Sequence, residues 1–400
     1  MKEFGGETMM TRSYLILAFA AFPAMLWGQF SSGSTGSDGA LSLTASGTVT
    51  LDPSTLPNHC ANNVCNFSSI TIGANTVVVL TSQLWRNASV VWLSQGAVNI
   101  AGALHVDGSN GAQMNAANPG LNRFPASPGP GGFPGGVGGY LSQPAQPGAG
   151  FGGGAAGNPT NHGGASAVYS YYNNQLTPLV GGSGGGGGYQ GTSTAGGNGG
   201  GGGGAIRIVS STSITVGGGI TANPGYSLGP VGSGSGGNGG QGSGGVIHLV
   251  APTVGGAGNL QTDYGGSSGV TEISTATNNF TAGQVLGAYV AAGLYAPPLP
   301  SGIPAVQVTS VNGVAAPQYP TANPMVPDVT INSSTPVSVV IAAQNIPTTT
   351  TVTLYLTSEN APDSTMTCGA LSGTVASSTA TCTGVNFPPG VTITNILAVW

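Results

Sequence analysis

The chain has 400 residues, of which 73 are glycine and 28 are proline, and only 4% of its residues are charged. Soluble domains usually carry about a quarter of charged residues, so this chain lacks the basic surface that nucleic-acid binding needs and the Glu/Lys content of a coiled coil. Its hydrophobic fraction of 39% also argues against a polar, disordered chain. Composition therefore indicates a folded protein that does not bind nucleic acid.

The first segment has the features of a secretory signal. Arg12 is followed by an apolar run from Tyr14 to Trp27, and Gly28 then provides a small residue for cleavage. The run covers about 14 residues, whereas a membrane-spanning helix needs about 20. We expect residues 1–28 to be a signal peptide, and a mature chain without a membrane span that is extracellular or on the cell surface.

The four cysteines fit an exported chain, because disulfides form in oxidising compartments. Their spacing proposes Cys60 with Cys65 and Cys368 with Cys382, although three pairings are formally possible. Neither pair has the C-x-x-C spacing of a zinc site. His59 lies beside Cys60, but the other histidines are scattered along the chain. We predict two local disulfides, no metal and no cofactor.

A repeat of short alternating segments marks the first three quarters of the chain. Similar strings begin at Val90, Ile206 and Ile247, and their alignment matches Leu104 with Ile220 and Leu260. Each unit has apolar side chains at every second position, so it has one face to bury and needs neighbours to bury it. The repeat predicts an all-β fold, a parallel β-helix (solenoid) over residues 29–296, with these units as successive stacked layers.

Two glycine-rich insertions, at about residues 109–203 and 225–245, interrupt this repeat. Residues 101–250 hold 49 of the 73 glycines. Each glycine destabilises regular secondary structure by roughly 0.5 to 1 kcal/mol relative to alanine. With so many glycines, two alternatives are left for these segments. Either these segments are flexible loops, or they pack as polyproline II strands in a way that only glycine permits.

Residues 305–400 contain short alternating runs, with turn residues at intervals close to ten residues, which is typical of an immunoglobulin-like β-sandwich. The Pro-rich stretch 297–304 reads as the linker before it. The alternating strand that ends at Trp400 is expected at an edge of this sandwich.

Three strings carry a resemblance to a known group: GGGGGGAIRIVSSTSITVGGGITANPG, GSGGVIHLVAPTVGGAGNLQTDYGG and PAVQVTSVNGVAAPQYPTANPMVPDVTI. They resemble glycine-rich secreted β-helix proteins of environmental, Acidobacteria-like bacteria. The resemblance implies a signal peptide, β-helix layers broken by glycine-rich loops, and a C-terminal β-sandwich. It implies no catalytic residues.

The repeat alignment places Asp107, Asn223 and Asp263 at one position of successive layers. If the layers stack directly, the two carboxylates would lie about 9 to 10 Å apart, close to the upper end of the separation in inverting glycosidases. Asp107 and Asp263 are therefore the catalytic candidates if the protein is an enzyme. The alternative is that all three are corner residues, because each precedes Gly or Pro within two positions. The same alignment sets Arg207 beside His248, where we expect a solvated outward face.

One glycine-free island, Val168 to Gln175, lies within the longest insertion. Tyr169, Tyr171 and Tyr172, with the amides of Asn173 and Asn174, could form a stacking platform for a sugar or a protein partner. The alternative is a hydrophobic pin that holds the insertion to the rest of the protein.

Three functions follow from these features. The first is a non-catalytic, exported structural or adhesion-type protein of the bacterial surface or extracellular matrix. The second is a carbohydrate-active enzyme that uses Asp107 and Asp263. The third is non-catalytic glycan binding through the tyrosine island, with a cell-surface or matrix glycan or protein as partner.

Overall fold

The computed structural model describes residues 30–400 except 113–122, 141–142, 170–175, 193, 231–234, 266, 296–303, 318–319, 321–325, 359–362 and 391. The expected signal peptide, residues 1–28, and most of the expected linker lie outside the described residues. Apart from three short 3-10 helices, at Pro53–Thr55, Ala61–Asn63 and Ala282–Gln284, the regular structure of the described residues is β-strand. No helix in the described part of the chain has the length and apolarity to cross a membrane.

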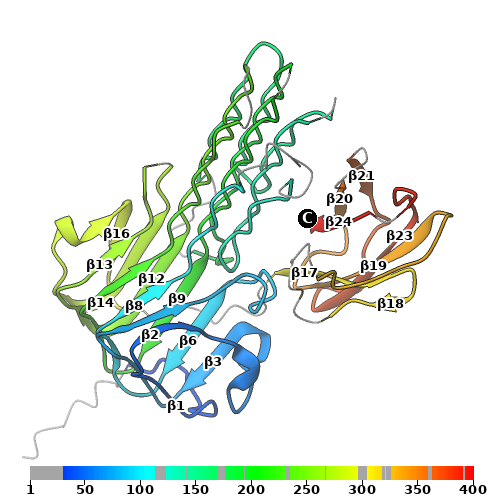
Figure 1. The fold of residues 1–400 in the computed structure, drawn as a ribbon. Coiled ribbons are helices and arrows are strands. Elements are labelled where there is room, and N and C mark those ends of the chain that lie inside the picture. Colours follow the sequence, from blue (N-terminus) through cyan, green and yellow to red (C-terminus); the bar gives the residue numbers. More distant parts are fainter. Residues whose placement is uncertain are drawn as a thin grey trace, which may run out of the picture.

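The larger N-terminal sheet has ten strands, and all their pairings are parallel (Figure 1). Eight of them follow one hydrogen-bonded path: β1 (Ala40–Leu43), β4 (Ser69–Ile72), β7 (Val98–Ile100), β10 (Ser213–Val216), β12 (Val246–Gly255), β9 (Ala205–Ser210), β6 (Val90–Ser94) and β3 (Val64–Phe67). Strand β14 (Val270–Asn278) pairs with β12, and β16 (Ala288–Ala292) pairs with β14.

A second parallel sheet has six strands, in the order β15 (Val285–Leu286), β13 (Asn259–Gln261), β11 (Gly219–Thr221), β8 (Ala103–His105), β5 (Thr76–Val79) and β2 (Gly47–Thr50). Side chains of both sheets form one hydrophobic cluster that includes Trp92, Ile100, Leu104, Ile206 and Ile247, each fully or almost fully buried. The alternating pattern of the sequence is the reason, because every second residue of a strand faces the same side.

The predicted register of the repeats is observed. Val90 pairs with Ile206, and Ile206 pairs with Ile247. Ile220 likewise pairs with both Leu104 and Leu260. The three repeats are therefore neighbours in the parallel sheets, as their alignment requires.

The predicted fold class, a parallel β-helix, is wrong. The eight-strand path forms a nearly closed parallel barrel instead. The turning point is β12, whose ten residues run without a break: its first half pairs with β9 and its last three residues pair with β10. Alternation and repeats specify parallel pairing and register, but whether a sheet closes depends on such a long strand, which joins two rows of shorter strands.

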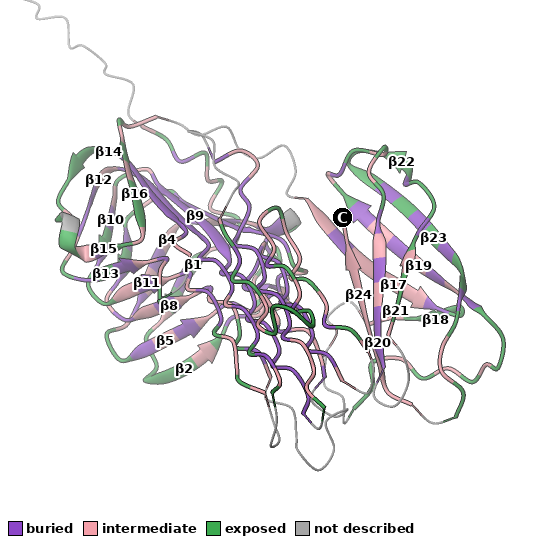
Figure 2. Ribbon diagram, turned by 90° about the horizontal axis from the view of Figure 1, so that it is seen from above, coloured by how far each residue is buried: buried purple, intermediate pink, exposed green. Residues whose placement is uncertain are grey.

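The C-terminal strands are antiparallel and form two sheets. One contains β18 (Val314–Ala315), β17 (Ala305–Val311), β19 (Val337–Gln344), β23 (Ser377–Val385) and β22 (Ser372–Thr374). The other contains β21 (Ser364–Thr367), β20 (Thr353–Ser358) and β24 (Thr394–Val399). Buried residues alternate with partly buried ones along β19 and mostly with exposed ones along β23 (Figure 2), and both sheets contribute to one hydrophobic cluster. Strand β24 is an edge strand, as expected for the alternating run before Trp400.

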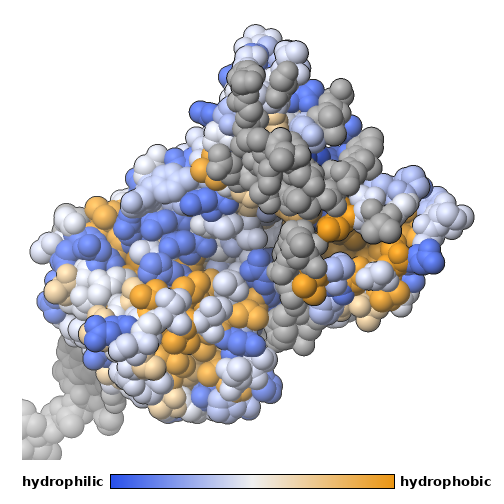
Figure 3. Space-filling view, in the orientation of Figure 1, coloured by the Kyte–Doolittle hydropathy of each residue, from blue (hydrophilic) through white to orange (hydrophobic). Residues whose placement is uncertain are grey.

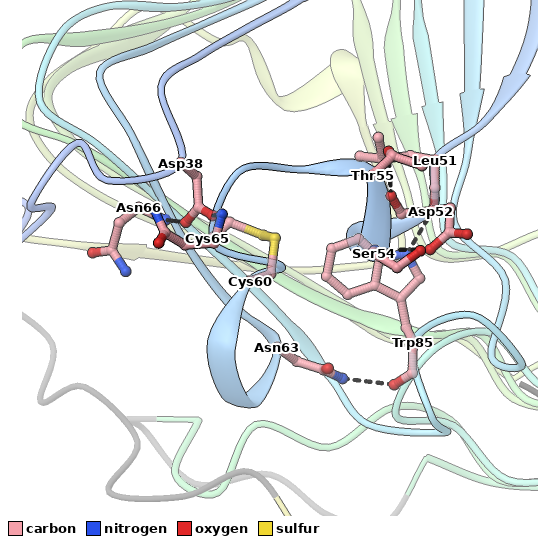
Figure 4. Close-up of a disulfide and its surroundings, with 11 residues drawn as sticks. Asp38, Leu51, Asp52, Ser54, Thr55, Cys60, Asn63, Cys65, Asn66 and Trp85 are labelled. Carbon is pink, nitrogen blue, oxygen red and sulfur yellow. Dashed lines mark hydrogen bonds between the residues drawn. A yellow bond between two sulfur atoms is a disulfide. The ribbon is translucent and has the colours of Figure 1, made fainter. Parts of the chain in front are cut away.

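Both predicted disulfides are formed. Cys60 is bonded to Cys65 (Figure 4), and Cys368 is bonded to Cys382. Around the first disulfide, the Asp38 carboxylate accepts the Asn66 N–H at 2.6 Å, and the Asn63 side chain donates to the Trp85 carbonyl at 2.6 Å. This disulfide and its neighbours hold the irregular connection between β2 and β3 against the barrel.

Candidate functional site

The two glycine-rich insertions fold together into one projection, called the glycine bundle below. It consists of extended segments that run back and forth beside one another (Figure 1). The segments cover residues 126–139, 145–157, 162–168, 180–191, 194–204, 222–228 and 236–245. Most residues of the inner segments are buried (Figure 2), so the described parts of the insertions are packed rather than loose.

Backbone hydrogen bonds hold the bundle together with a period of three residues. In segment 180–191, the N–H groups of Gly182, Gly185 and Gly188 all donate to segment 194–204, at 2.7, 2.9 and 2.8 Å. Gly184 and Gly187 donate to segment 145–157, at 2.9 and 2.8 Å. A polyproline II helix has three residues per turn, so successive residues of one segment reach different neighbours.

Glycine is required inside the bundle for a steric reason. A Cβ atom built on Gly184 would lie 1.8 Å from the carbonyl oxygen of Pro134, and one on Gly187 would lie 2.0 Å from that of Val137. A Cβ on Gly186 would lie 2.0 Å from the carbonyl oxygen of Ala155. Gly184 and Gly187 thus meet segment 126–139, Gly186 meets segment 145–157, and no side chain fits at any of the three. Of the two alternatives for the insertions, the described residues adopt the packed one.

The bundle has an end that lies far from the barrel. Segment 194–204 leads directly into β9, so its first residue lies roughly 30 Å from the barrel at about 3.1 Å per residue. Near that end the imidazole of His162 stacks on the ring of Tyr189, with 5.7 Å between the ring centroids. The Tyr189 N–H donates to the His162 carbonyl at 2.7 Å, and His162 is exposed. We call His162, Tyr189 and the exposed turn 158–161 the tip.

The two predicted catalytic carboxylates have different surroundings: Asp107 holds the corner between the barrel and the bundle, and Asp263 lies in the turn between β13 and β14, with one oxygen buried without a described hydrogen-bond partner. One Asp107 carboxylate oxygen accepts the Asn223 N–H at 2.6 Å, and the other accepts the Thr221 hydroxyl at 2.8 Å and lies 3.0 Å from His105 Nδ1. The Asp263 carboxylate accepts the Ser268 hydroxyl at 2.8 Å. Such contacts with nearby backbone and side-chain donors are those of corner residues, and they favour the structural alternative for Asp107.

The expected solvated position of Arg207 and His248 is wrong. Adjacent strands place Arg207, His248 and Glu272 side by side, and their exposed fractions are 1%, 0% and 0%. Arg207 Nε donates to His248 Nδ1 at 3.0 Å, and His248 Nε2 lies 3.6 Å from a Glu272 oxygen. A hydrophobic cluster that includes Leu176, Leu179 and Val250 covers this outer face of the sheet. We call Arg207, His248 and Glu272 the buried charged row.

Burial shifts the pKa values in this row. It lowers the pKa of Arg207, and together with the nearby Arg207 charge it lowers the pKa of His248 well below its usual range. Burial raises the pKa of Glu272, although hydrogen bonds from Ser274 and Tyr295 act in the opposite direction. Arg207 also donates to the Leu176 carbonyl at 3.0 Å, so the row fixes the segment that returns from the tyrosine island.

Most of the tyrosine island lies outside the described residues, including Tyr171, Tyr172, Asn173 and Asn174. Tyr169 is described, and it packs against the cluster that covers the buried charged row. Its hydroxyl donates to the Val180 carbonyl at 3.2 Å. These contacts hold Tyr169 against the covered sheet face, and such partial burial is expected under both alternatives for the island.

A small cavity lies where the barrel, the bundle and the sandwich meet. Its volume is about 60 Å³, and its lining includes Phe133 of the bundle, Leu179, and Trp400 of the sandwich. Sites for drug-sized ligands have about 300–1,000 Å³, so this cavity admits a few water molecules.

Figure 3 shows hydrophobic surface on both the barrel and the sandwich. Within the described residues, no group of three or more His, Cys, Asp or Glu side chains could hold a metal ion.

Two further contacts were not predicted from the sequence. One is between the exposed tyrosines Tyr226 and Tyr264, and the other is the buried ion pair between Arg123 and Asp363, which are 240 residues apart. Periodicity gives no signal for either, because both depend on how distant segments meet.

Comparison with known proteins gives no relative. No model of a protein family, no curated protein and no solved structure matches the chain. The resemblance to glycine-rich secreted bacterial proteins therefore stays a prediction, and function has to be inferred from geometry.

Proposed function

We propose that this protein is a non-catalytic, exported structural or adhesion-type protein of the bacterial surface or extracellular matrix. In this proposal the barrel carries the glycine bundle as a stiff projection, and the tip meets the partner, a cell-surface or matrix glycan or protein. The observation that carries the proposal is the dense backbone hydrogen bonding of segment 180–191 on several sides, which makes an extended shape rigid without a wide core.

Rigidity matters for a projecting contact because it lowers the entropy that is lost on binding. A flexible loop of similar length would lose conformational freedom when its end was held, whereas the bundle is already ordered. The exposed turn 158–161 and His162 supply amide, hydroxyl and imidazole groups at the tip. Aromatic and amide side chains of this kind are common at recognition surfaces.

The proposal is tested with the purified chain and with a double tip variant, His162→Ala with Tyr189→Ala. Labelled protein is added to surface-immobilised bacteria and to isolated matrix, and the retained fraction is measured by fluorescence. We expect the tip variant to be retained at least about tenfold less, because the central residues of an interface dominate its affinity. Tyr289→Ala, at an exposed tyrosine of β16, is the matched control and should bind like the wild type.

Two outcomes would contradict the proposal. One is unchanged retention of the tip variant. The other is turnover of a polysaccharide from a test panel that Asp263→Asn abolishes, which would establish the enzyme alternative instead. Equal unfolding midpoints of the wild type and the tip variant are required, so that loss of folding is not mistaken for loss of contact.

A further inference from the structure

A pair of exposed tyrosines lies at the base of the glycine bundle. Tyr226 belongs to segment 222–228, which leaves β11, and Tyr264 lies in the turn after β13. Their ring centroids are 5.2 Å apart and the ring planes are inclined at 72°. Exposed fractions are 37% for Tyr226 and 51% for Tyr264. The edge of one ring therefore packs against the face of the other, and the remaining ring surfaces are open. We call this exposed, unenclosed tyrosine pair the step.

Local contacts fix the backbone on both sides of this step. The Asn110 side chain accepts the Tyr226 N–H at 2.8 Å, and the Gln241 side chain donates to the Tyr264 carbonyl at 2.8 Å. Both contacting side chains come from the glycine bundle or its entry. The step is thus held by ordered segments, which limits the entropy lost when a ligand binds.

The phenol hydroxyls distinguish this pair from other tyrosines of the protein. Neither the Tyr226 nor the Tyr264 hydroxyl forms a hydrogen bond within the described residues, whereas the Tyr289 hydroxyl accepts one from Asn278 at 2.6 Å. Tyr289 is 38% exposed, close to the value for Tyr226. The pair therefore offers two apolar ring surfaces together with two hydroxyls that have no described protein partner.

We propose that Tyr226 and Tyr264 form a binding site for a neutral polysaccharide, a ligand class that suits both halves of this surface. The face of an aromatic ring is electron-rich and attracts the weakly positive C–H groups on one face of a pyranose, while the perpendicular second ring contacts the edge of the same sugar. Sugar hydroxyls then pair with the phenol groups. An open step with no enclosing walls fits a chain segment rather than a small molecule.

The surrounding charge selects a neutral polymer over an anionic one. Asp263 immediately precedes Tyr264. One of its carboxylate oxygens accepts the neutral Ser268 hydroxyl, and the other is buried without a hydrogen-bond partner among the described residues, so no described cation neutralises the group. A uronic-acid polymer would therefore meet a like charge beside the second tyrosine. The site rests on the proposed extracellular location, but it is separate from the tip and adds a second contact by which the protein is retained on a matrix.

The experiment is affinity electrophoresis of the full chain in native gels that contain one polysaccharide each. The neutral arms are hydroxyethyl cellulose, xylan, glucomannan and dextran, and the anionic arm is alginate. We expect at least one neutral polymer to retard the wild type, Tyr226→Ala and Tyr264→Ala to bind at least about tenfold more weakly, and Tyr289→Ala to stay within about twofold. Tyr264→Phe keeps the ring and should keep most of the binding.

Three results would overturn the inference. They are a wild type that no neutral polymer retards, retardation by alginate alone, and equal weakening in Tyr264→Ala and the Tyr289→Ala control. Unfolding midpoints are measured for each variant, and Tyr264→Phe separates loss of stacking from misfolding. If tip-dependent retention on cells persists while the gels show no retardation, this inference fails and the proposed function stands.

Discussion

Single glycine residues decide whether the projection can form. Inside the bundle a Cβ atom would overlap carbonyl oxygens of neighbouring segments, as at Gly184, Gly186 and Gly187. Backbone atoms cannot move aside as the end of a flexible side chain can, so even one methyl group separates two segments and breaks their hydrogen bonds. Glycine loses more conformational entropy on folding than other residues, but its lack of a Cβ atom is what allows these backbones to pack closely.

Gly187→Ala is expected to destabilise the protein by about 1–3 kcal/mol, the usual effect of overpacking a dense interior. Gly163→Ala is the matched control, because the nearest atom to its Cβ would be 3.9 Å away. That control should be neutral, or stabilising by about 0.4–1 kcal/mol through the unfolded chain. Urea unfolding at neutral pH measures both. Equal free energies of unfolding for the two variants would show that the bundle is loose.

The strands β9, β12 and β14 bring three ionisable side chains into one buried row, which no single strand would produce. Each of Arg207, His248 and Glu272 occupies the same position on its own strand, and the parallel register aligns them. Isolated buried charges are unfavourable unless they are paired. The members of the row contact one another, and the shifted pKa values of His248 and Glu272 favour their neutral forms. Both effects reduce the cost of burial.

The row predicts pH dependences of opposite sign. The lowered pKa of His248 keeps it neutral in the folded protein while the unfolded chain takes up a proton, so this group reduces stability as pH falls below 6.5. The raised pKa of Glu272 reduces stability as pH rises above 4.5. Each full proton contributes about 1.4 kcal/mol per pH unit.

Relative to the wild type, Glu272→Gln should therefore lose stability between pH 7 and pH 5, because only the His248 contribution is left. His248→Gln should gain stability over the same interval. Urea midpoints of the wild type and both variants at pH 5 and pH 7 measure the two differences. Differences of the same sign in both variants would show that the two groups are not buried as described.

At the scale of the whole molecule, a buried ion pair joins the glycine bundle to the sandwich. The Arg123 guanidinium binds both Asp363 oxygens at 2.6 Å, and the Gln146 side chain donates to the same carboxylate at 2.9 Å. Exposed fractions are 2% for the Arg123 side chain and 8% for that of Asp363. Nearby, Trp400 of the sandwich contacts Phe133 and Phe151 of the bundle, so polar and aromatic contacts both link these two parts.

Asp363→Ala should destabilise the protein by about 3–5 kcal/mol, because it leaves the buried Arg123 charge without its partner. We expect native trypsin to spare Arg123 in the wild type and to cut after it in the variant. Cleavage after Arg86, which is partly exposed in the wild type, is the internal control. Rapid cleavage of the native wild type after Arg123 would contradict the buried position of this residue.

Local pattern was sufficient for several features of this protein. Alternation placed Leu104, Ile220 and Leu260 on one buried face. The repeat predicted their register, because the apolar positions of successive repeats meet one another only when equivalent residues pair. Short separation was enough to pair Cys60 with Cys65 and Cys368 with Cys382. These features depend on residues that are close along the chain or that repeat along it.

Only the tertiary structure decided the closure of the barrel, the burial of Arg207 and His248, and the packing of the glycine-rich insertions. Closure depends on β12, which pairs with two rows of strands at once. Burial of Arg207 and His248 depends on a segment that returns from a distant insertion. Alternation of apolar residues alone does not distinguish an outer face that another segment covers from one that is exposed to solvent. A run of glycines has no side-chain pattern, so its order arises solely from the backbones that surround it.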